Sequence, residues 1–416
     1  MEVVAATTAS TQPLLRKRSP FEAKLVSDHS INIDKLHAAM SILPQNYSFE
    51  VDKTICRILD LRKQGTRVQK VSLQFPEGLL TYSTLIADIL ATFTGVDCLI
   101  LGDVTYGACC VDDLASKALA CDFVVHYGHS CLVPIQELSL KHALYVFVEI
   151  DIDVEHLVAS IALSFKGQPL TLLGTIQFNK ALFVAKAMLE RLHGFTDVQI
   201  PQTKPRSGGE VLGCTSPALG EGVAVFVSDG RFHIESAMIK NPQLRFFQYN
   251  PYSLKLTSEV YEHQAMHEIR FKEIERARAA KRFGIVFGTL GRQGSQTLLK
   301  EIEALLRQHS KPYFVLFLSE ISPAKLNRFA NVEAWVQIAC PRLSVDWGHC
   351  GFKAPLLNTY EAFVCLGEAA WLQGGVYPMD YYSYEGGRWS NYFRENEQRK
   401  QRLASKPKKP VKIEYE

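Results

Sequence analysis

The sequence predicts an α/β protein built from three related, doubly wound domains. Short runs rich in β-branched and aromatic residues recur along the 416 residues. These runs are apolar throughout rather than alternating, which is typical of parallel strands covered on both faces. Amphipathic stretches with apolar residues three and four positions apart separate the runs, as crossover helices do. A composition of 47% hydrophobic and 21% charged residues is that of a globular protein.

The first domain is expected over residues 50–148. Its strands are predicted at VSLQFPEG, DCLILGD, FVVHYG and LYVFVEI. The stretch at 79–93 has helical periodicity and is predicted to cross between the first two of these strands. Residues 1–49 are expected to form an N-terminal extension that is partly disordered.

The second domain is expected over residues 149–257. Strands are predicted at LTLLGTIQF, VAVFVSDG and LRFFQY, with a crossover helix at 180–194. A long connecting helix is predicted to follow over 258–282. It would begin with Ser258 as its N-cap and stop before Gly284.

The third domain is expected over residues 283–385. Strands are predicted at GIVFGTLG, YFVLFLSE, AWVQIAC and AFVCLG, with a helix at 295–310. The remaining residues, 386–416, are expected to form a flexible basic tail. Residues Arg394 to Glu416 carry eight Lys/Arg and four Asp/Glu, a net of +4, so the rest of the chain has a net charge of 3 − 4 = −1. A body without net positive charge does not have the signature of a nucleic-acid-binding protein.

The chain is expected to work in the cytoplasm. Its N-terminal residues lack the apolar core of a secretory signal, and no stretch is apolar enough to span a membrane. The ten cysteines are then expected to be reduced. Accessible cysteines are therefore candidates for metal binding or catalysis rather than for disulfides.

Each predicted domain has a cysteine corner after a strand or turn, beside Gly, Pro or other small residues. The corners are YGACC with Cys109 and Cys110, LGCTSP with Cys214, and IACPRLSVDWG with Cys340. Ligands gather at the carboxyl ends of strands in open α/β sheets, so three such units could direct three thiolates to one place. Three thiolates suit a soft metal, and a [4Fe-4S] cluster held by three cysteines has one iron open to a ligand.

A second, local group offers a different metal hypothesis. The stretch VVHYGHSC carries His126 and His129 between Cys121 and Cys131. These four residues could hold zinc, although their spacing matches no familiar zinc finger. The alternative is a histidine at the end of a strand that neighbouring hydrogen bonds satisfy.

Other small-residue corners contribute polar groups. Gly-rich turns that enter helices present N–H groups to anions, and arginine can hold a carboxylate with two hydrogen bonds. GTLGRQGS lacks the GK[ST] of a Walker A loop. The polar residues at these corners are Gln177 in TIQF, Asp229, Arg231 and His233 in SDGRFH, and Arg292 in GTLGRQGS.

Taken in order, these stretches resemble a known family. PEGLL, GDVTYGACCVDD, DFVVHYGHSCLVP, GTIQF, LGCTSP, DGRFHIES, GTLGRQGS and ACPRLSVDWG closely resemble subunit 1 of the eukaryotic 2-(3-amino-3-carboxypropyl)histidine synthases. That family acts in the first step of diphthamide biosynthesis. The resemblance covers roughly residues 50–385 and leaves out both ends of the chain.

The resemblance implies three α/β domains arranged around a central [4Fe-4S] cluster, with one cysteine ligand from each. The implied enzyme is a noncanonical radical transferase. It cleaves the bond between Cγ of the methionine part and sulfur in S-adenosylmethionine, and releases methylthioadenosine. The 3-amino-3-carboxypropyl group adds to C2 of a histidine imidazole in translation elongation factor 2.

By the same resemblance the cluster ligands are Cys109, Cys214 and Cys340. Archaeal relatives resemble YGACD, so Cys109 aligns with their cysteine and Cys110 takes the place of Asp. Cys110 stays open as a substitute ligand. Gln177 and Arg292 are candidates for holding the carboxylate and amine of S-adenosylmethionine, and His233 is a candidate for assisting proton removal. No other catalytic residue is identified.

The resemblance also implies partners. Members of the family form a heterodimer with a paralogous second subunit and receive electrons from a small iron-binding protein served by a reductase. Elongation factor 2 is the protein substrate, and no nucleic acid or membrane partner is expected. Two other functions stay open: a zinc-dependent hydrolase or transferase, and a non-catalytic scaffold for the second subunit.

Overall fold

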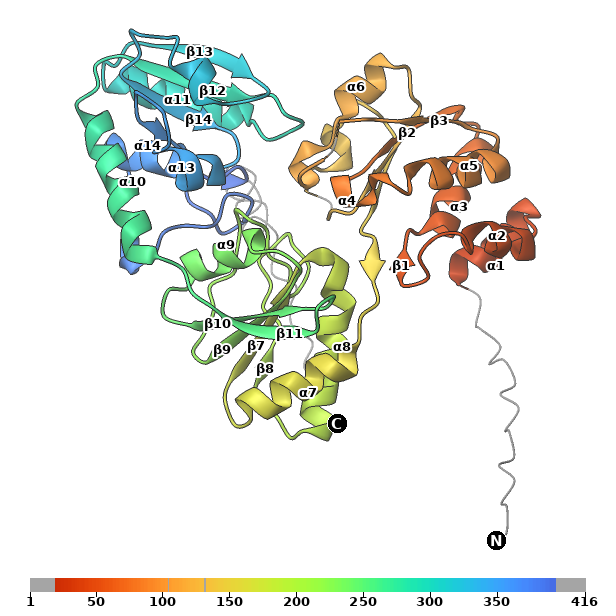
Figure 1. Ribbon diagram of the computed structural model, residues 1–416. Coiled ribbons are helices and arrows are strands. Elements are labelled where there is room, and N and C mark those ends of the chain that lie inside the picture. The colour runs from red at the N-terminus through yellow and green to blue at the C-terminus, as the bar shows by residue number, and fades with distance from the viewer. Residues whose placement is uncertain (1–18, 104, 131, 394–416) are drawn as a thin grey trace, which may run out of the picture.

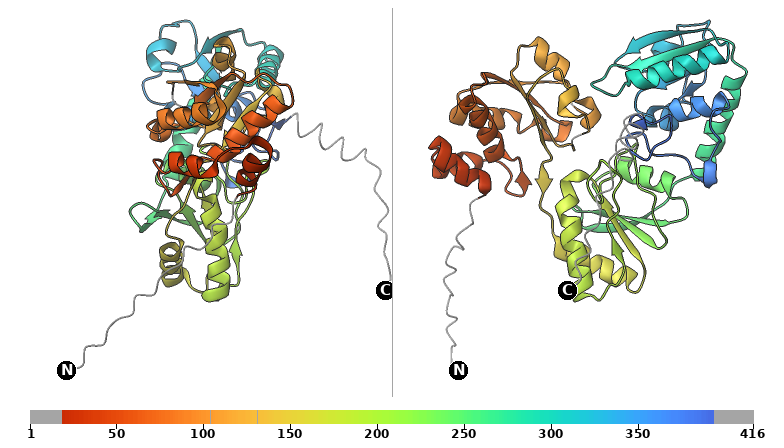
Figure 2. Two further views of the ribbon diagram at one scale, coloured as in Figure 1. Left: turned by 90° about the vertical axis from the view of Figure 1, so that its right-hand side faces the viewer. Right: turned by 180° about the vertical axis from the view of Figure 1, so that it is seen from behind.

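The computed structural model describes residues 19–103, 105–130 and 132–393, which form three α/β units (Figure 1). Each unit has its own sheet of four or five strands. Figures 1 and 2 show the units at the corners of a triangle: the first in red and orange, the second in yellow and green, the third in cyan and blue. Within these described residues, no helix has the length and apolar character needed to cross a membrane. The α/β fold class predicted from the sequence is confirmed.

The first unit is a parallel sheet with the strand order β3-β2-β4-β5. Its strands are β2 (Lys70–Gln74), β3 (Asp97–Ile100), β4 (Phe123–Tyr127) and β5 (Ala143–Val146). Its helices are α3 (Val51–Lys63), α4 (Glu77–Leu80), α5 (Ser83–Thr94) and α6 (Asp113–Ala118), with 3-10 turns at Ala108–Cys110 and Ile135–Glu137. Strand β4 is buried at every position, which explains why its sequence is apolar apart from His126.

Helices before residue 50 complete the core of this unit. They are α1 (Pro20–His29) and α2 (Ile33–Met40), and Ser19 caps α1 in a capping box with Glu22. Leu25 and Leu36 are fully buried in the same cluster as the sheet residue Val71. The folded unit therefore begins well before the expected boundary at residue 50. The first 18 residues of the predicted extension lie outside the described residues.

A small antiparallel pair links the first unit to the second. It joins β1 (Tyr47–Ser48) to β6 (Glu149–Ile150). The run LYVFVEI, predicted as one strand, is divided between β5 and β6 because the backbone turns at Val148, which has φ 50°. The chain leaves the first sheet at this point.

The second unit has the strand order β11-β10-β9-β7-β8. The strands are β7 (Leu170–Gly174), β8 (Val198–Gln199), β9 (Val223–Val227), β10 (Arg245–Asn250) and β11 (Lys255–Glu259). The helices are α7 (Val154–Phe165), α8 (Asn179–Leu192) and α9 (Phe232–Lys240), with a 3-10 turn at Ile176–Phe178.

Ser258 was predicted to cap a helix, and this was wrong: Ser258 pairs with Phe247 in the antiparallel edge of the sheet. The connecting helix α10 begins only at His263 and ends at Arg278.

The third unit has the strand order β13-β12-β14-β15. Its strands are β12 (Phe283–Gly288), β13 (Tyr313–Leu318), β14 (Ala334–Ile338) and β15 (Leu356–Leu357). Its helices are α11 (Gln296–Gln308), α12 (Pro323–Leu326), α13 (Arg342–Trp347) and α14 (Thr359–Cys365), with a 3-10 turn at Gln373–Gly375.

The prediction of a strand at AFVCLG was wrong, since these residues lie in α14 and the turn after it. Helix α14 is capped by Asn358 and buried at every position, so its sequence has no polar face that would identify a helix.

After α14 the chain returns to the centre of the molecule. Asp380 forms a bridge with Thr215, and the N–H of Tyr384 donates to the carbonyl of Lys204 at 3.0 Å. The hydroxyl of Tyr392 donates to the carbonyl of Leu132 in the first unit. This return segment, residues 376–393, therefore contacts both other units and continues beyond the domain end expected at residue 385.

A buried ion pair joins α10 to α14. Arg270 donates from Nε and Nη2 to the two carboxylate oxygens of Glu361, at 2.7 Å each, and neither side chain is exposed. The hydroxyl of Tyr377 also donates to Glu361, at 2.9 Å. We expect Arg270→Met to lower the free energy of unfolding by about 3–5 kcal/mol, because Glu361 would remain buried without its charge partner.

Urea denaturation followed by circular dichroism measures this effect. The matched control is Arg278→Met, which removes a pair with Glu275 on the exposed side of the same helix. The control should cost less than about 1 kcal/mol. Equal small losses for both variants would contradict the role given to Arg270.

Candidate metal centre and adjoining cavity

The first cysteine corner lies a few residues beyond β3. Residues Ala108–Cys110 form a single 3-10 turn after Gly107. The loop after β12 closes over this turn, and the N–H of Arg292 donates to the carbonyl of Cys109 at 2.7 Å. Gly291 has φ 54°, and a Cβ at this position would lie 2.5 Å from Cα of Cys110. The glycines of GTLGRQGS thus allow the third unit to approach the corner closely.

The two adjacent cysteines of this corner have different neighbours. Their Sγ atoms are 4.0 Å apart. Cys109 interacts electrostatically with Cys340 and Cys214. Cys110 is buried, and its Sγ accepts a hydrogen bond from Nε2 of Gln293 at 3.4 Å. Cys109 therefore interacts with the cysteines of both other units, and of these two Cys110 interacts with Cys340 alone.

The second corner holds Cys214 in a tight turn of the second unit. Leu212 and Thr215 exchange backbone hydrogen bonds of 2.9 and 3.2 Å on either side of it. The return segment fixes the turn from outside, because the N–H of Tyr381 donates to the carbonyl of Cys214 at 3.3 Å. The N–H of Tyr382 donates to the hydroxyl of Thr215 at 2.9 Å. The position of Cys214 therefore depends on residues more than 160 positions later in the chain.

The third corner follows β14, where Cys340 precedes α13. The buried side-chain amide of Gln337 donates to the carbonyl of Cys340 at 3.0 Å. The N–H of Arg342 forms a hydrogen bond with the thiol, which by itself lowers the pKa of Cys340. Burial is the larger effect and raises that pKa to about 11.

The structure brings the three corners together. Burial raises the pKa of Cys214, and the charge of Cys340 adds to the rise. The pKa of Cys109 is raised as well, first by its hydrogen bond with Cys110 and then by burial. The charges of Cys340 and Cys214 raise it further. Buried thiols that oppose one another's ionisation stay protonated unless a cation compensates their charge. A metal centre supplies such a charge, so these three residues are suited to hold one.

The spacing of the three thiols limits the kind of metal centre. Cys109, Cys214 and Cys340 do not all lie within 4.8 Å of one another at their sulfur atoms. Two sulfurs bound to one zinc ion cannot be farther apart than about 4.6 Å, since each Zn–S bond is about 2.3 Å. At these positions the three sulfurs do not jointly ligate one zinc ion, whereas a [4Fe-4S] cluster is large enough to take one ligand from each.

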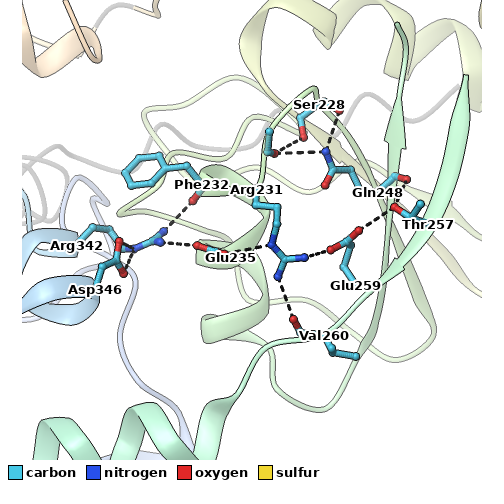
Figure 3. A network of polar contacts seen from close by, with 11 residues as sticks. Ser228, Arg231, Phe232, Glu235, Gln248, Thr257, Glu259, Val260, Arg342 and Asp346 are labelled. Atoms are coloured by element: carbon cyan, nitrogen blue, oxygen red, sulfur yellow. Dashed lines mark hydrogen bonds and ion pairs between the residues drawn. The ribbon is translucent and has the colours of Figure 1, made fainter. Parts of the chain in front are cut away.

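Arg342 links the third corner to the second unit, where Phe232 and Glu235 accept its hydrogen bonds (Figure 3). Its Nη1 donates to the carbonyls of Gly213 at 3.2 Å and Phe232 at 2.8 Å, and its Nη2 donates to Glu235 at 2.6 Å. Nε donates to Asp346 at 2.9 Å. Burial by itself lowers the pKa of Arg342, but the two carboxylates outweigh it and raise the pKa. The guanidinium also lies 4.6 Å from the ring centroid of Phe232.

A cavity of about 330 Å³ adjoins the first two corners. The first unit contributes PEGLL residues, the turn at Tyr106–Ala108 and His129. The second unit contributes Thr175, Gln177, Glu210 and Leu212, together with Asp229 and His233. A small ligand in this cavity would lie next to the cysteine corner of the first unit.

Three of the polar residues singled out in the sequence line this cavity: Gln177, Asp229 and His233. Arg292 does not. Its Nε and Nη2 donate to the two oxygens of Asp113 at 2.9 and 2.6 Å, so it joins the third unit to the first. Arg231 does not line the cavity either, because its guanidinium is held by Glu259 and by the carbonyl of Val260 (Figure 3). The expected role of Arg292 in holding a carboxylate ligand is thus corrected to an interdomain ion pair.

His126 and His129 belong to a buried hydrogen-bond chain. Nε2 of Gln74 donates to the carbonyl of Asp112 at 2.7 Å, which fixes the orientation of the side-chain amide. Oε1 of the same amide therefore accepts from Nδ1 of His126 at 2.9 Å. Nε2 of His126 then accepts from Nδ1 of His129 at 3.3 Å, and Nε2 of His129 is left without a proton. Burial lowers the pKa of His129 to about 4, which keeps the ring neutral.

The zinc hypothesis at this stretch finds no support from geometry. Cys121 does not join His126 and His129 in a group of ligand atoms, and Cys131 lies outside the described residues. Among residues whose placement is described, one such group exists, formed by His29, Cys56 and Asp60 in the first unit. There Nζ of Lys24 already donates to Asp60 at 2.6 Å, so the carboxylate has its cation.

Several residues around the cysteines were not identified from the sequence. Tyr381 and Tyr382 are buried and experience the charges of Cys214 and Cys109. Arg342 and Glu210 are buried charged residues at the same place. Of these four residues, only Arg342 lies in a stretch that the sequence analysis had selected, ACPRLSVDWG.

Comparison with known proteins identifies the family. A family model described as a diphthamide synthesis protein matches residues 75–377. The 2-(3-amino-3-carboxypropyl)histidine synthase subunit 1 of Dictyostelium discoideum is 49% identical over 381 residues, covering 89% of this chain and 78% of its own length. The protein of the same name from Mus musculus is 48% identical over 380 residues, covering 90% and 84%.

Solved structures agree with this assignment. The crystal structure of Dph2 from Pyrococcus horikoshii superposes with a TM-score of 0.62 at 25% identity, covering 76% of this chain and 90% of that one. A second structure of the same protein contains a 4Fe-4S cluster and superposes equally well. The chain therefore belongs to the family of diphthamide synthesis proteins.

Proposed function

We propose that the chain is the cluster-bearing subunit of a 2-(3-amino-3-carboxypropyl)histidine synthase. The reaction moves the 3-amino-3-carboxypropyl group of S-adenosylmethionine to C2 of a histidine imidazole in translation elongation factor 2 and releases methylthioadenosine. The observation that carries this proposal is the convergence of one thiol from each unit, buried at Cys214 and partly buried at Cys109 and Cys340, beside a cavity. The names of the relatives and the cluster in the Pyrococcus protein support it.

In this proposal Cys109, Cys214 and Cys340 hold a [4Fe-4S] cluster. Their spacing favours a cluster over a single zinc ion, as argued above. Cys109 is preferred to Cys110 because Cys109 interacts with both other cysteines, whereas Gln293 donates a hydrogen bond to Cys110. When bound, such a cluster supplies an electron and one iron with an open position.

The residues of the chain bind and orient S-adenosylmethionine. We place it in the cavity beside Tyr106–Ala108, where its sulfur would lie near the first corner. Gln177 lines the same cavity, and its side-chain amide can both donate to a carboxylate and accept from an amine. Arg292 is no longer a candidate for this contact because Asp113 occupies its guanidinium.

The transfer also releases one proton. A C–S bond and a C–H bond break and one C–C bond forms, with no net gain or loss of electrons. His233 lines the cavity, and burial lowers its pKa to about 4, so its ring is neutral and has an unprotonated nitrogen, but it is a weak base that would hold the proton only briefly before passing it to water. We assign this role to His233.

The proposed assembly follows the family. The relatives are named subunit 1, which supports a partner in the form of a paralogous second subunit. A small iron-binding protein with its reductase would deliver electrons, and the enzyme would meet elongation factor 2 in the cytoplasm. A non-catalytic scaffold is the competing function. It does not require three thiols from three units in mutual electrostatic contact.

Product analysis tests this function. The protein is purified anaerobically with the second subunit, reduced with dithionite, and given S-adenosylmethionine and elongation factor 2. We expect methylthioadenosine and a mass gain of one aminocarboxypropyl group on the factor, and neither change with a factor whose target histidine is replaced. Transfer of a methyl group, or an unmodified factor despite an intact cluster, would refute the proposal.

A further inference from the structure

One carboxylate in the cavity has an oxygen without a partner. The side chain of Glu210 is almost fully buried, with 2% of the residue exposed. Its Oε2 accepts from the N–H of Ser207 at 3.1 Å. Its Oε1 is buried and has no hydrogen-bond partner among the described residues.

The backbone holds Glu210 firmly in this position. Glu210 forms a parallel bridge with Gly174 at the end of β7, and the N–H of Val211 donates to the carbonyl of Gly174 at 3.2 Å. Gly209, just before it, has φ 77°, and a Cβ there would lie 2.8 Å from a methyl group of Leu182. The carboxylate is therefore built into the wall of the cavity rather than carried on a free loop.

The buried cation closest in sequence to Glu210, Arg206, donates to Ser130 at 3.0 Å and forms no ion pair of 4.0 Å or less with Glu210. None of the described residues that line it is Lys or Arg, and a second carboxylate, Asp229, lines it as well. The two histidines in the wall, His129 and His233, are neutral because burial lowers the pKa of each to about 4. A buried carboxylate with one oxygen unpartnered and no ion pair is costly, so a cationic ligand would be stabilised here.

The unpartnered atoms also specify the kind of cation. Thr175 follows Gly174, lines the same cavity, and has a buried hydroxyl oxygen without a partner. Two unpartnered oxygens call for a ligand that donates more than one hydrogen bond. A sulfonium has no N–H or O–H to donate, whereas an ammonium group has three N–H donors.

We propose that Glu210, together with Thr175, binds the α-ammonium group of S-adenosylmethionine. This inference rests on the proposed function and adds the residues that recognise the group to be transferred. A charge-assisted hydrogen bond in a buried site fixes the direction of the aminocarboxypropyl chain relative to the sulfur. Glu210 would then make the binding affinity higher for a ligand that carries the amine than for one that lacks it.

Equilibrium binding tests this inference without requiring turnover. Titration calorimetry on the full chain, prepared anaerobically with its iron, compares S-adenosylhomocysteine with an analogue that lacks only the amine. Wild-type protein should bind the amine-bearing ligand about 10- to 100-fold more tightly. Glu210→Gln should lose most of this preference, and the binding of methylthioadenosine, which lacks the whole chain, should not change.

The control is Glu221→Gln, which removes an exposed carboxylate from the same unit and should leave the preference intact. Equal affinities of wild-type protein for the ligands with and without the amine would overturn the inference, and that result does not depend on whether a variant folds. A preference that survives in Glu210→Gln would also overturn it. Failure of wild-type protein to bind any of these adenosyl compounds would instead count against the proposed function.

Discussion

Replacing Cys109, Cys214 or Cys340 one at a time with alanine is expected to remove the cluster. Each variant loses one of three protein ligands, and the two that remain cannot retain a cluster that depends on all three. We expect the iron content and the visible absorbance of the anaerobic protein to fall at least about 10-fold, and methylthioadenosine release to fall with them. Iron analysis and absorption spectra measure this directly.

Two other cysteines are matched controls. Cys110→Ser changes the residue next to Cys109, and Cys365→Ser changes a buried thiol in α14. Both should keep their iron, although Cys110→Ser also loses a hydrogen bond from Gln293. Retention of iron by Cys109→Ala together with loss of iron from Cys110→Ser would reverse the assignment at the first corner.

Replacing Arg342 with methionine is expected to loosen the contact between the second and third units. The arginine side chain is 3% exposed and forms ion pairs with Glu235 and Asp346. Removing it leaves Asp346 without a cation and Glu235 with only the exposed Arg231, which should cost about 3 kcal/mol of stability. Because Arg342 also holds the carbonyl of Gly213, the iron content should fall as well.

Arg231→Met is the control for this variant. Arg231 belongs to the same network and pairs with Glu235 and Glu259, but its side chain is 47% exposed (Figure 3). Its loss should cost less than about 1 kcal/mol and leave the iron content unchanged. Thermal denaturation and iron analysis of both variants give the comparison. The same melting temperature and iron content for Arg342→Met as for wild-type protein would contradict this role.

The fold was predictable where burial leaves a clear sequence pattern. Strands β2, β4, β7, β9, β12 and β14 lie in mainly apolar runs because almost all of their residues are buried. The same feature made α14 unpredictable, since a helix buried on all sides is as apolar as a buried strand. The strand at Lys255–Glu259 was missed because it is an edge strand with exposed, polar positions.

The candidate site was predictable in part. Gln177 and His233 could be selected because strand ends and glycine-rich turns are where ligands bind in such sheets. Arg292 was assigned to the wrong contact, because a sequence does not show that Asp113 of another unit neutralises it. Tyr381, Tyr382 and Glu210 have no local motif, and they reach the site only through the return of the chain and the packing of the sheet.

The central claim is that three cysteines, one from each unit, hold a cluster with one iron open to S-adenosylmethionine. The most direct measurement is a Mössbauer spectrum of the ⁵⁷Fe-labelled protein with and without S-adenosylmethionine. The account predicts a [4Fe-4S] cluster in which one iron differs from the other three and changes when S-adenosylmethionine is added. Four equivalent irons that do not respond, or a colourless protein with one zinc per chain, would contradict it.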